Sequence, residues 1–141
     1  MKRKASAVWH GSLKDGKGAI TTDSGVLKDT QYSFGTRFEN GPGTNPEELI
    51  AAAHVGCFAM AFSAELGRAG VTPETISASA TVTLEKTDAG WTVTESHLDV
   101  TVKVPGGKKE QILGIANVAK AGCPISRLLY AKVTMDAKAE V

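Results

Sequence analysis

The chain has 141 residues, of which 42% are hydrophobic and 22% are charged, a composition typical of one globular domain with an apolar core. Its formal net charge is +1, from 16 basic and 15 acidic residues, so it lacks the one-sided field that attracts nucleic acid or an anionic membrane. We therefore expect a single domain over residues 1–141 whose partners include neither nucleic acid nor a membrane.

Two apolar runs are too short for an export signal or a membrane span. The basic start, MKRK, is followed by an apolar run from Ala5 to Trp9 only, whereas a secretory signal needs roughly 7–15 apolar residues. The most apolar run, Leu49 to Phe62, is shorter than the roughly 20 residues that span a bilayer, and it includes His54. These features favour a cytoplasmic protein, in which thiols stay reduced.

Segments typical of β-strands fill the first part of the chain. The sequences SAVWHG and GAITTDSG flank an Asp15-Gly16 pair, a tight-turn signal that predicts a hairpin. The segment TQYSFGTRFE is rich in aromatic residues and predicts a third strand that runs to about Phe38. The next residues, ENGPGTNP, contain two glycines and two prolines and predict a loop.

A long apolar helix is predicted after this loop. Its start, TNPEE, offers either Thr44 or Asn45 as the cap residue, a proline suited to the first position, and two glutamates that complement the positive end of the helix dipole. Helix-forming residues continue to Leu66 and are apolar around most of the circumference. We therefore expect other structure to enclose this helix.

The second half predicts a hairpin, two short helices and a last strand. Residues 77–107 alternate apolar and polar side chains on either side of KTDAGW, which indicates a long hairpin with a continuing strand. KKEQILGIANVAKAG is typical of an amphipathic helix, CPISRLLYA begins a second helix at a Cys-Pro pair, and KVTMDAKAEV is typical of a strand. The segregation of strands and helices favours an α+β fold.

The chain has two cysteines, Cys57 and Cys123, 66 residues apart. Taken alone, Cys57 is more simply a small buried hydrophobic residue, because a thiol in an apolar helix reacts slowly unless a cation lies beside it. Cys123 lies between a glycine that ends one helix and a proline that opens the next, where a helix dipole favours the thiolate. If the sulfurs meet, one could be oxidised by peroxide to a sulfenic acid and the other could condense with it to a disulfide, which a dithiol would reduce.

A metal site is a weaker alternative. His54 and Cys57 share one face of the predicted helix, but His10 and His97 are isolated in the sequence, and no CxxC or HExxH motif occurs. Because structural zinc takes four thiolate or imidazole ligands, we expect no metal, and we expect His54 to be packed or hydrogen-bonded. A Ser-His-Asp hydrolase is weaker still, because no nucleophile-elbow motif is present.

Three motifs together resemble a known family. The sequence GTNPEELIAAAHVGCF, the later AKAGCPIS and the upstream TRFE closely resemble the osmotically induced protein C and organic hydroperoxide resistance (OsmC/Ohr) family of thiol peroxidases. The likeness extends from His10 to the last strand, and NPEELIAAAHVGCF, GVL and YSFGTRFE are more similar to the OsmC branch. The resemblance implies an OsmC/Ohr-like α+β fold, with antiparallel sheets around the long apolar helix, in an intertwined homodimer.

The resemblance also implies roles for four residues. Cys57 matches the peroxidatic cysteine, and Cys123 matches the resolving cysteine. Arg37 matches the arginine that stabilises the thiolate and orients the peroxide, and Glu47 matches the acidic residue that holds this arginine. The guanidinium would supply the cation that a buried thiol needs. We expect Glu48 to be a solvated residue of the first helical turn.

An apolar pocket beside these residues would favour an alkyl hydroperoxide over hydrogen peroxide. For each proposed lining residue taken singly, a place in the ordinary core is the simpler expectation. The lining residues expected from the sequence are Phe34, Leu49, Phe58, Met60 and Phe62.

The spacing of Glu47 and Cys57 poses a geometric problem. Ten residues on one helix correspond to about 15 Å of rise, which is too far for one compact site. Either the helix begins well after Glu47, or the Arg37 and Glu47 beside a given Cys57 come from a second subunit. The family's homodimer, with sites at the subunit interface, favours the second solution. It would also explain an all-round apolar helix, because part of that helix would face its partner.

The resemblance therefore implies a cytoplasmic, homodimeric peroxidase of oxidative and osmotic stress defence. It would reduce organic hydroperoxides to alcohols without a metal or organic cofactor and would be recycled by an external dithiol, with lipoyl-type dithiols favoured over thioredoxin. Two other interpretations stay open. One is a non-catalytic redox sensor or ligand-binding module that uses the same thiols, and the other is a structural protein whose buried thiols are inert.

Overall fold

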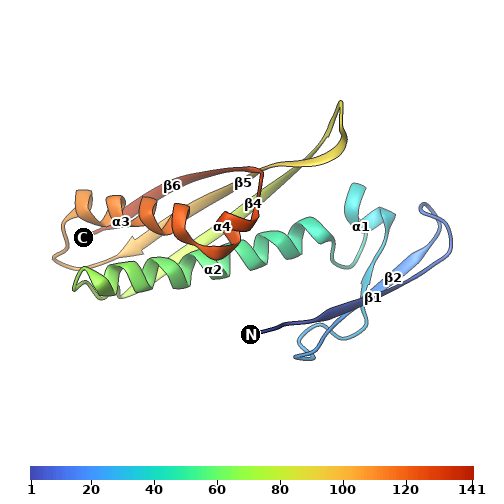
Figure 1. Cartoon of the computed structure of the whole chain (residues 1–141), viewed down its shortest axis with the longest axis horizontal. Coiled ribbons are helices and arrows are strands. Elements are labelled where there is room, and N and C mark those ends of the chain that lie inside the picture. The colour runs from blue at the N-terminus through green and yellow to red at the C-terminus, as the bar shows by residue number, and fades with distance from the viewer. The chain divides into compact units, whose positions relative to one another are not determined.

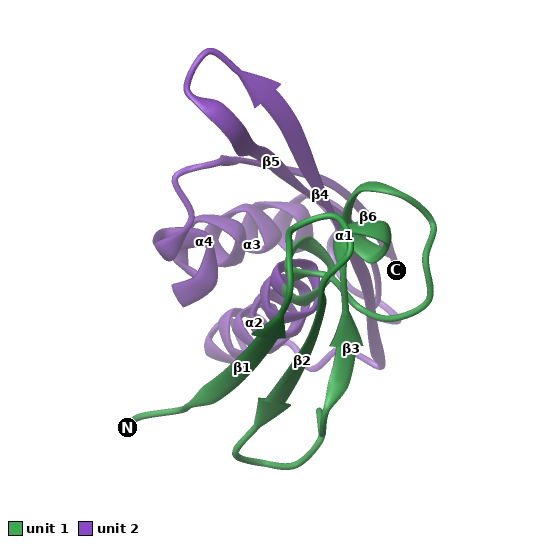
Figure 2. Ribbon diagram, turned by 90° about the vertical axis from the view of Figure 1, so that its right-hand side faces the viewer, with its two compact units in different colours: residues 1–49 green, residues 50–141 purple.

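The computed structural model describes all residues from 1 to 141, and these form two compact units, residues 1–49 and residues 50–141. Each unit contains its own three-stranded sheet (Figure 1). The long helix α2 (Pro46–Arg68) begins in the first unit and continues in the second (Figure 2). The predicted α+β class and the long apolar helix are confirmed.

The first unit is built on an antiparallel sheet of β1 (Ala5–His10), β2 (Lys17–Thr22) and β3 (Thr30–Tyr32). The predicted hairpin is confirmed, because β1 pairs with β2 along its whole length. Gly18 of β2 lies beneath the rings of Trp9 and Tyr32, whose centroids are 5.5 Å apart. A Cβ atom at this position would lie 2.3 Å from the Tyr32 ring, so only glycine fits.

The third strand is shorter than the sequence predicted. It ends at Tyr32, and the short helix α1 (Phe34–Phe38) follows, so the predicted extension to Phe38 is wrong. A capping box starts this helix: the Ser33 hydroxyl accepts from the Thr36 N–H at 3.3 Å, and the Thr36 hydroxyl accepts from the Ser33 N–H at 2.8 Å. The aromatic residues that suggested a strand instead pair along the helix, with the Phe34 and Phe38 rings 4.8 Å apart.

Asn45 starts α2. Its side-chain oxygen accepts from the Glu48 N–H at 2.8 Å, as an N-cap residue does, and its side-chain nitrogen donates to the Thr36 carbonyl at 3.0 Å. Thr44, the alternative cap, instead donates its hydroxyl to Glu48 at 2.8 Å. The cap therefore also joins the start of α2 to α1.

The second unit contains a sheet in the order β4 (Thr75–Thr87), β5 (Gly90–Lys103) and β6 (Lys132–Glu140). The predicted long hairpin is confirmed, since β4 and β5 pair antiparallel, with Thr75 opposite Lys103 at one end and Thr87 opposite Gly90 at the other. The sheet as a whole is mixed rather than antiparallel, because β6 pairs parallel to β5. The reason is the connection: α3 (Lys109–Gly122) and α4 (Pro124–Leu128) form the kind of helical crossover that parallel strands require.

The core of the second unit lies between the helices and one face of this sheet (Figure 1). Buried side chains recur every fourth residue on α2 and alternate along β5, as a one-sided helix and a one-sided strand require. The members from α2 and β5 are His54, Phe58, Phe62, Leu66, Ser96, Leu98, Val100 and Val102.

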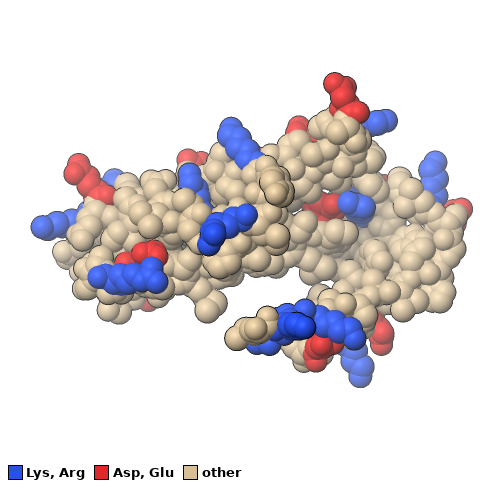
Figure 3. Space-filling model, viewed as in Figure 1, with Lys and Arg blue, Asp and Glu red and all other residues tan.

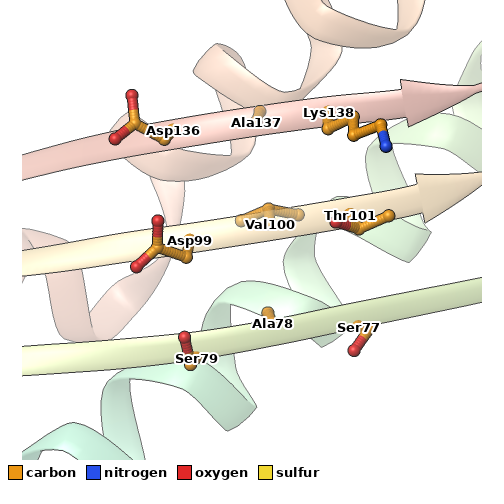
Figure 4. A pocket seen from close by; sticks show the side chains of 9 residues that line it. All are labelled: Ser77, Ala78, Ser79, Asp99, Val100, Thr101, Asp136, Ala137 and Lys138. Atoms are coloured by element: carbon orange, nitrogen blue, oxygen red, sulfur yellow. The ribbon is translucent and has the colours of Figure 1, made fainter.

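The opposite face of the sheet is polar. Figure 4 shows the carboxylates of Asp99 and Asp136 side by side on β5 and β6, with Ser79 on the neighbouring strand β4. Charges of both signs are interspersed on the face of the chain in Figure 3, in keeping with the net charge of +1.

Only one stripe of α2 is buried within the chain. The opposite stripe consists of small residues and one methionine, and it is exposed. Its members are Ala52, Ala53, Gly56, Met60, Ser63, Ala64 and Gly67, which we call the small-residue face of α2. By length and composition α2 is also apolar enough to cross a membrane, but the core helix of a soluble protein meets the same criterion.

Candidate active site

Both cysteines lie at the edge of the second unit's core. Cys57 is on α2, one turn after His54, and its side chain is partly buried. Cys123 is fully buried at the junction of two helices, where it ends α3 and begins α4. Its N–H donates to the Ala119 carbonyl at 2.9 Å, and its carbonyl accepts from the Arg127 N–H at 3.0 Å.

This turn brings the two sulfurs together. Cys123 Sγ lies 2.8 Å from Cys57 Sγ, within hydrogen-bonding distance, and both thiols are free. The sequence left this contact open, because 66 residues separate the two cysteines. The structure therefore holds a preformed dithiol of which only Cys57 has a side chain that solvent reaches.

The surroundings of Cys57 within its own unit oppose ionisation. Burial raises the pKa of the Cys57 thiol, and the hydrogen bond and charge of Cys123 raise it further. The backbone N–H of Ile125 donates to the Cys57 sulfur and acts in the opposite direction on its pKa. None of these groups is a cation, so a reactive thiolate at Cys57 requires a positive charge from elsewhere.

His54 is completely buried beside the thiol pair. Its Nδ1 lies 2.6 Å from the Ser96 hydroxyl and its Nε2 lies 2.8 Å from the Ser126 hydroxyl. Burial lowers the pKa of His54 and so favours the neutral ring. The expectation of a packed and hydrogen-bonded histidine is confirmed, and neither ring nitrogen is free to bind a metal together with Cys57.

Arg37 and Glu47 form a two-pronged ion pair within the first unit. Arg37 Nη2 and Nε donate to Glu47 Oε1 at 2.8 and 3.1 Å, which joins the last turn of α1 to the first turn of α2. The Glu47 side chain is only 12% exposed, whereas that of Arg37 is 39% exposed. Glu47 thus holds the guanidinium in one orientation while part of it stays accessible. Glu48 is exposed.

An apolar pocket of about 290 Å³ lies beside Arg37 in the same unit. Of the lining residues expected from the sequence, only Phe34 contributes to it. The sequence did not predict the other apolar walls as pocket residues, and the one signal for three of them is the density of aromatic residues before residue 39. They are Trp9, Leu13, Tyr32, Phe38 and Pro46.

The remaining expected pocket residues lie elsewhere. Phe58 and Phe62 are fully buried in the core of the second unit, which was the simpler expectation for each alone. Met60 is 77% exposed on the small-residue face of α2. Leu49 is partly buried near the start of α2.

One of the two explanations for the spacing of Glu47 and Cys57 is excluded. The helix does not begin after Glu47, because α2 is continuous from Pro46 to Arg68. About 15 Å of helical rise therefore separates the two residues.

One cluster in the chain has the side chains of a metal site. His97 is isolated in sequence but not in space: its Nε2 lies 3.1 Å from Asp136 Oδ2 and 3.5 Å from Asp99 Oδ1, while Nδ1 is hydrogen-bonded to Thr134. These residues lie on the polar face of the sheet, away from the buried thiols. Both carboxylates are well exposed, and exposed acidic groups commonly cluster without a metal ion.

A chain with two adjacent free thiols and an arginine–glutamate ion pair can be compared with known proteins. The family model described as OsmC-like protein matches residues 39–138. The chain belongs to the OsmC-like family. Among its OsmC relatives, peroxiredoxin OsmC of Escherichia coli (strain K12) is 51% identical over 134 residues, which cover 95% of this chain and 94% of that protein. Peroxiredoxin OsmC of Shigella flexneri matches to the same extent.

Solved structures share the OsmC-like fold. An OsmC-like protein from Mycoplasma pneumoniae has a TM-score of 0.77 at 14% identity, covering 100% of this chain and 99% of that one. The organic hydroperoxide resistance protein OhrB of Bacillus subtilis has a TM-score of 0.69 at 22% identity, covering 97% and 98%. The OsmC/Ohr-like fold that the resemblance implied is confirmed.

Proposed function

We propose that the peroxidase activity of this OsmC-family chain is the reduction of organic hydroperoxides to alcohols, with Cys57 as the nucleophile and Cys123 as the resolving thiol. The observation that carries this proposal is the 2.8 Å contact between the two sulfurs. Solvent exposure supports these roles, because Cys57 is partly exposed, whereas Cys123 is 0% exposed.

The reaction balances with the two thiols and one external dithiol. The Cys57 thiolate attacks the terminal peroxide oxygen, so an S–O bond forms, the O–O bond breaks, and the alkoxide takes a proton to leave as the alcohol. The Cys123 thiol then attacks the Cys57 sulfenic acid, which forms the disulfide and releases water. A dithiol, with a lipoyl-type dithiol as our first candidate, restores both thiols by exchange.

The cation for Cys57 comes, in this proposal, from Arg37 of a second copy of the chain. Three observations support this: α2 is continuous from Pro46, Glu47 holds Arg37 at that end of the helix, and the small-residue face of α2 is uncovered. Small residues allow two helices to approach closely, so a homodimer packed through this face would bury it. Each active site would then combine the thiols of one subunit with the arginine of the other.

The pocket beside Arg37 suits the organic part of the substrate. Its aromatic walls and volume of about 290 Å³ can accommodate an alkyl or aryl group, and the exposed part of the guanidinium can donate to the peroxide oxygens. As charge moves onto the leaving alkoxide, this donor stabilises the transition state. A free dithiol of this kind also fits the reducing cytoplasm, where we place the protein.

A redox sensor is the second candidate, because the same sulfur contact could form one disulfide without turnover. The test is steady-state consumption of cumene hydroperoxide in the presence of dihydrolipoamide, with thioredoxin and its reductase as the comparison donor. A peroxidase consumes many equivalents, whereas a sensor consumes one and stops. Consumption of a single equivalent with either donor would contradict the catalytic proposal.

Cysteine variants test the two roles separately. Cys57→Ser should fail to reduce even the first equivalent of hydroperoxide. Cys123→Ser should reduce that equivalent and then accumulate Cys57 sulfenic acid, which over-oxidises and is detected by intact mass. The reverse pattern would exchange the roles of Cys57 and Cys123.

A further inference from the structure

The proposed reaction makes no use of His54, although it is the only fully buried histidine of the chain. A neutral imidazole donates from one ring nitrogen and accepts at the other, and a serine hydroxyl can do either. With Ser96 at 2.6 Å and Ser126 at 2.8 Å, both ring nitrogens of His54 are satisfied. The histidine thereby joins three elements: α2, β5 and α4.

His54 connects the same two helices that the sulfurs connect. It lies three residues before Cys57 on α2, and Ser126 lies three residues after Cys123 on α4. Two contacts thus connect α2 with α4: the His54–Ser126 hydrogen bond and the Cys57–Cys123 contact. On each helix they lie about one turn apart.

The short helix α4 has few buried side chains of its own. The helix has only five residues, too few to be stable by itself, and Cys123 gives it no side-chain cap. None of the residues from Pro124 to Leu128 is fully buried, although Ile125 packs partly against the core. The partly buried hydrogen bond between His54 and Ser126 therefore helps to anchor this turn.

Ser126, which His54 binds, is adjacent in sequence to Ile125, whose backbone N–H acts on Cys57. Ile125 precedes Ser126, and its backbone N–H donates to the Cys57 sulfur. A donor aimed at sulfur stabilises the thiolate more than the thiol. A shift of this turn would move both the Ile125 N–H and the Cys123 sulfur away from Cys57.

We propose that His54 is a positioning residue: through Ser126 it fixes the first turn of α4 and so keeps both the Ile125 N–H and the Cys123 sulfur on Cys57. The consequence for peroxide reduction rests on the proposed function, but the effect on the thiols does not. In this role His54 exchanges no proton with the substrate. It sets how readily Cys57 ionises and how quickly the disulfide closes.

A matched pair of serine variants tests this role. Ser126→Ala and Ser96→Ala each remove one hydroxyl partner of His54, but Ser126 lies on the weakly anchored α4, whereas Ser96 lies on β5, which is paired on both sides. Two measurements are made without peroxide. They are the rate of Cys57 alkylation at fixed pH, resolved by peptide mass spectrometry, and the rate of Cys57–Cys123 disulfide formation by diamide.

Ser126→Ala should slow both reactions by about two- to tenfold, the range that one hydrogen bond is worth. Ser96→Ala should lower the thermal unfolding temperature about as much as Ser126→Ala does. It should leave both thiol rates near those of the parent. A purely structural role for His54 predicts the same small effect from both variants. Equal thiol rates in the two variants would therefore overturn the proposal.

Substitutions of His54 itself give a second comparison. A Gln side chain places its amide as many bonds from Cβ as Nε2, so His54→Gln can still bond Ser126, while the shorter side chain of His54→Asn reaches only toward Ser96. His54→Gln should retain more of both thiol rates than His54→Asn. If both unfold, the serine pair still decides. If the serine pair behaves as expected but no hydroperoxide is turned over, the proposed function fails and the positioning role stands.

Discussion

The Cys57 thiol is subject to opposing influences from its immediate neighbours. Burial and the Cys123 thiol raise its pKa, and only the Ile125 N–H favours the thiolate. A single backbone donor does not offset the loss of water around an anion, so a cation decides whether this thiol reacts at neutral pH. Arg37 is the candidate because its guanidinium is held by Glu47 yet stays 39% exposed.

Removal of this cation gives the prediction at the residue scale. Arg37→Ala should raise the pKa of Cys57 and slow its reaction with hydroperoxide, and each unit of pKa corresponds to about 1.4 kcal/mol of lost preference for the thiolate. Arg37→Lys should restore only part of the rate, since a point charge lacks the planar fork that engages Glu47. The alkylation rate as a function of pH and the rate constant for cumene hydroperoxide report the two effects.

The control for Arg37 is Arg68→Ala, which removes another arginine paired with a glutamate, Glu65, at the other end of α2. This variant should behave like the parent in both measurements. An Arg37→Ala protein that stays folded and dimeric, with an unchanged alkylation profile and an unchanged rate constant, would remove Arg37 from the mechanism.

Local sequence identified individual residues better than it identified their contacts. The motifs around Cys57 and Cys123 were visible, but their contact depends on a turn at Cys123 that the spacing alone does not reveal. The serines that bind His54 are 42 and 72 residues away along the chain, with no local signal. The sequence also does not distinguish pocket residues from core residues. Phe34 and Phe58 are both phenylalanines in apolar segments, yet Phe34 lines a pocket and Phe58 is buried in the core.

At the scale of elements, periodicity predicted α2 and the β4–β5 hairpin because each has a long, regular pattern. The aromatic residues of the segment from Phe34 to Phe38 favour a strand, whereas the capping box of Ser33 and Thr36 starts a helix there. The parallel pairing of β6 could not be predicted either. Strand direction follows from the route of the connection through α3 and α4, not from the composition of the strand.

The junction of α2, β5 and α4 at His54 gives a prediction for acid stability. Burial lowers the pKa of His54 in the folded protein below the value of 6.5 for an exposed histidine. Between these two pKa values, His54 is protonated in the unfolded chain but mostly neutral in the folded chain. Stability is full above about pH 6.5, and the free energy of unfolding should fall as the pH drops from there toward the lower folded-state pKa.

Urea unfolding at constant protein concentration between pH 7.5 and 5 measures this effect, above the range in which most carboxylates titrate. The control is His54→Gln, which removes the titrating group and keeps a polar side chain. Its free energy of unfolding should depend less on pH than that of the parent. Parallel profiles for the two proteins would show that other groups govern acid stability.

At the scale of the whole molecule, the two compact units divide the proposed chemistry between them. The arginine, its glutamate and the aromatic pocket belong to residues 1–49, and the thiols with His54 belong to residues 50–141. The small-residue face of α2 is the largest part of that helix without cover in the single chain. Both features are accounted for if two copies pack through α2 and exchange the parts of their active sites.

Complementation between two inactive variants tests this exchange. Cys57→Ser lacks the nucleophile, and Arg37→Ala lacks the cation, so neither should turn over cumene hydroperoxide at the parent rate. If Arg37 acts across the interface, a mixed dimer contains one complete site: the thiols of the Arg37→Ala subunit beside Arg37 of the Cys57→Ser subunit. Co-refolded or co-expressed variants should then recover activity that neither shows alone.

Introducing Met60→Glu into both, which places a carboxylate on the small-residue face of α2, should abolish the recovery and the dimer measured by sedimentation. If stable mixed dimers form and gain no activity, Arg37 serves the Cys57 of its own chain, and the shared site is wrong.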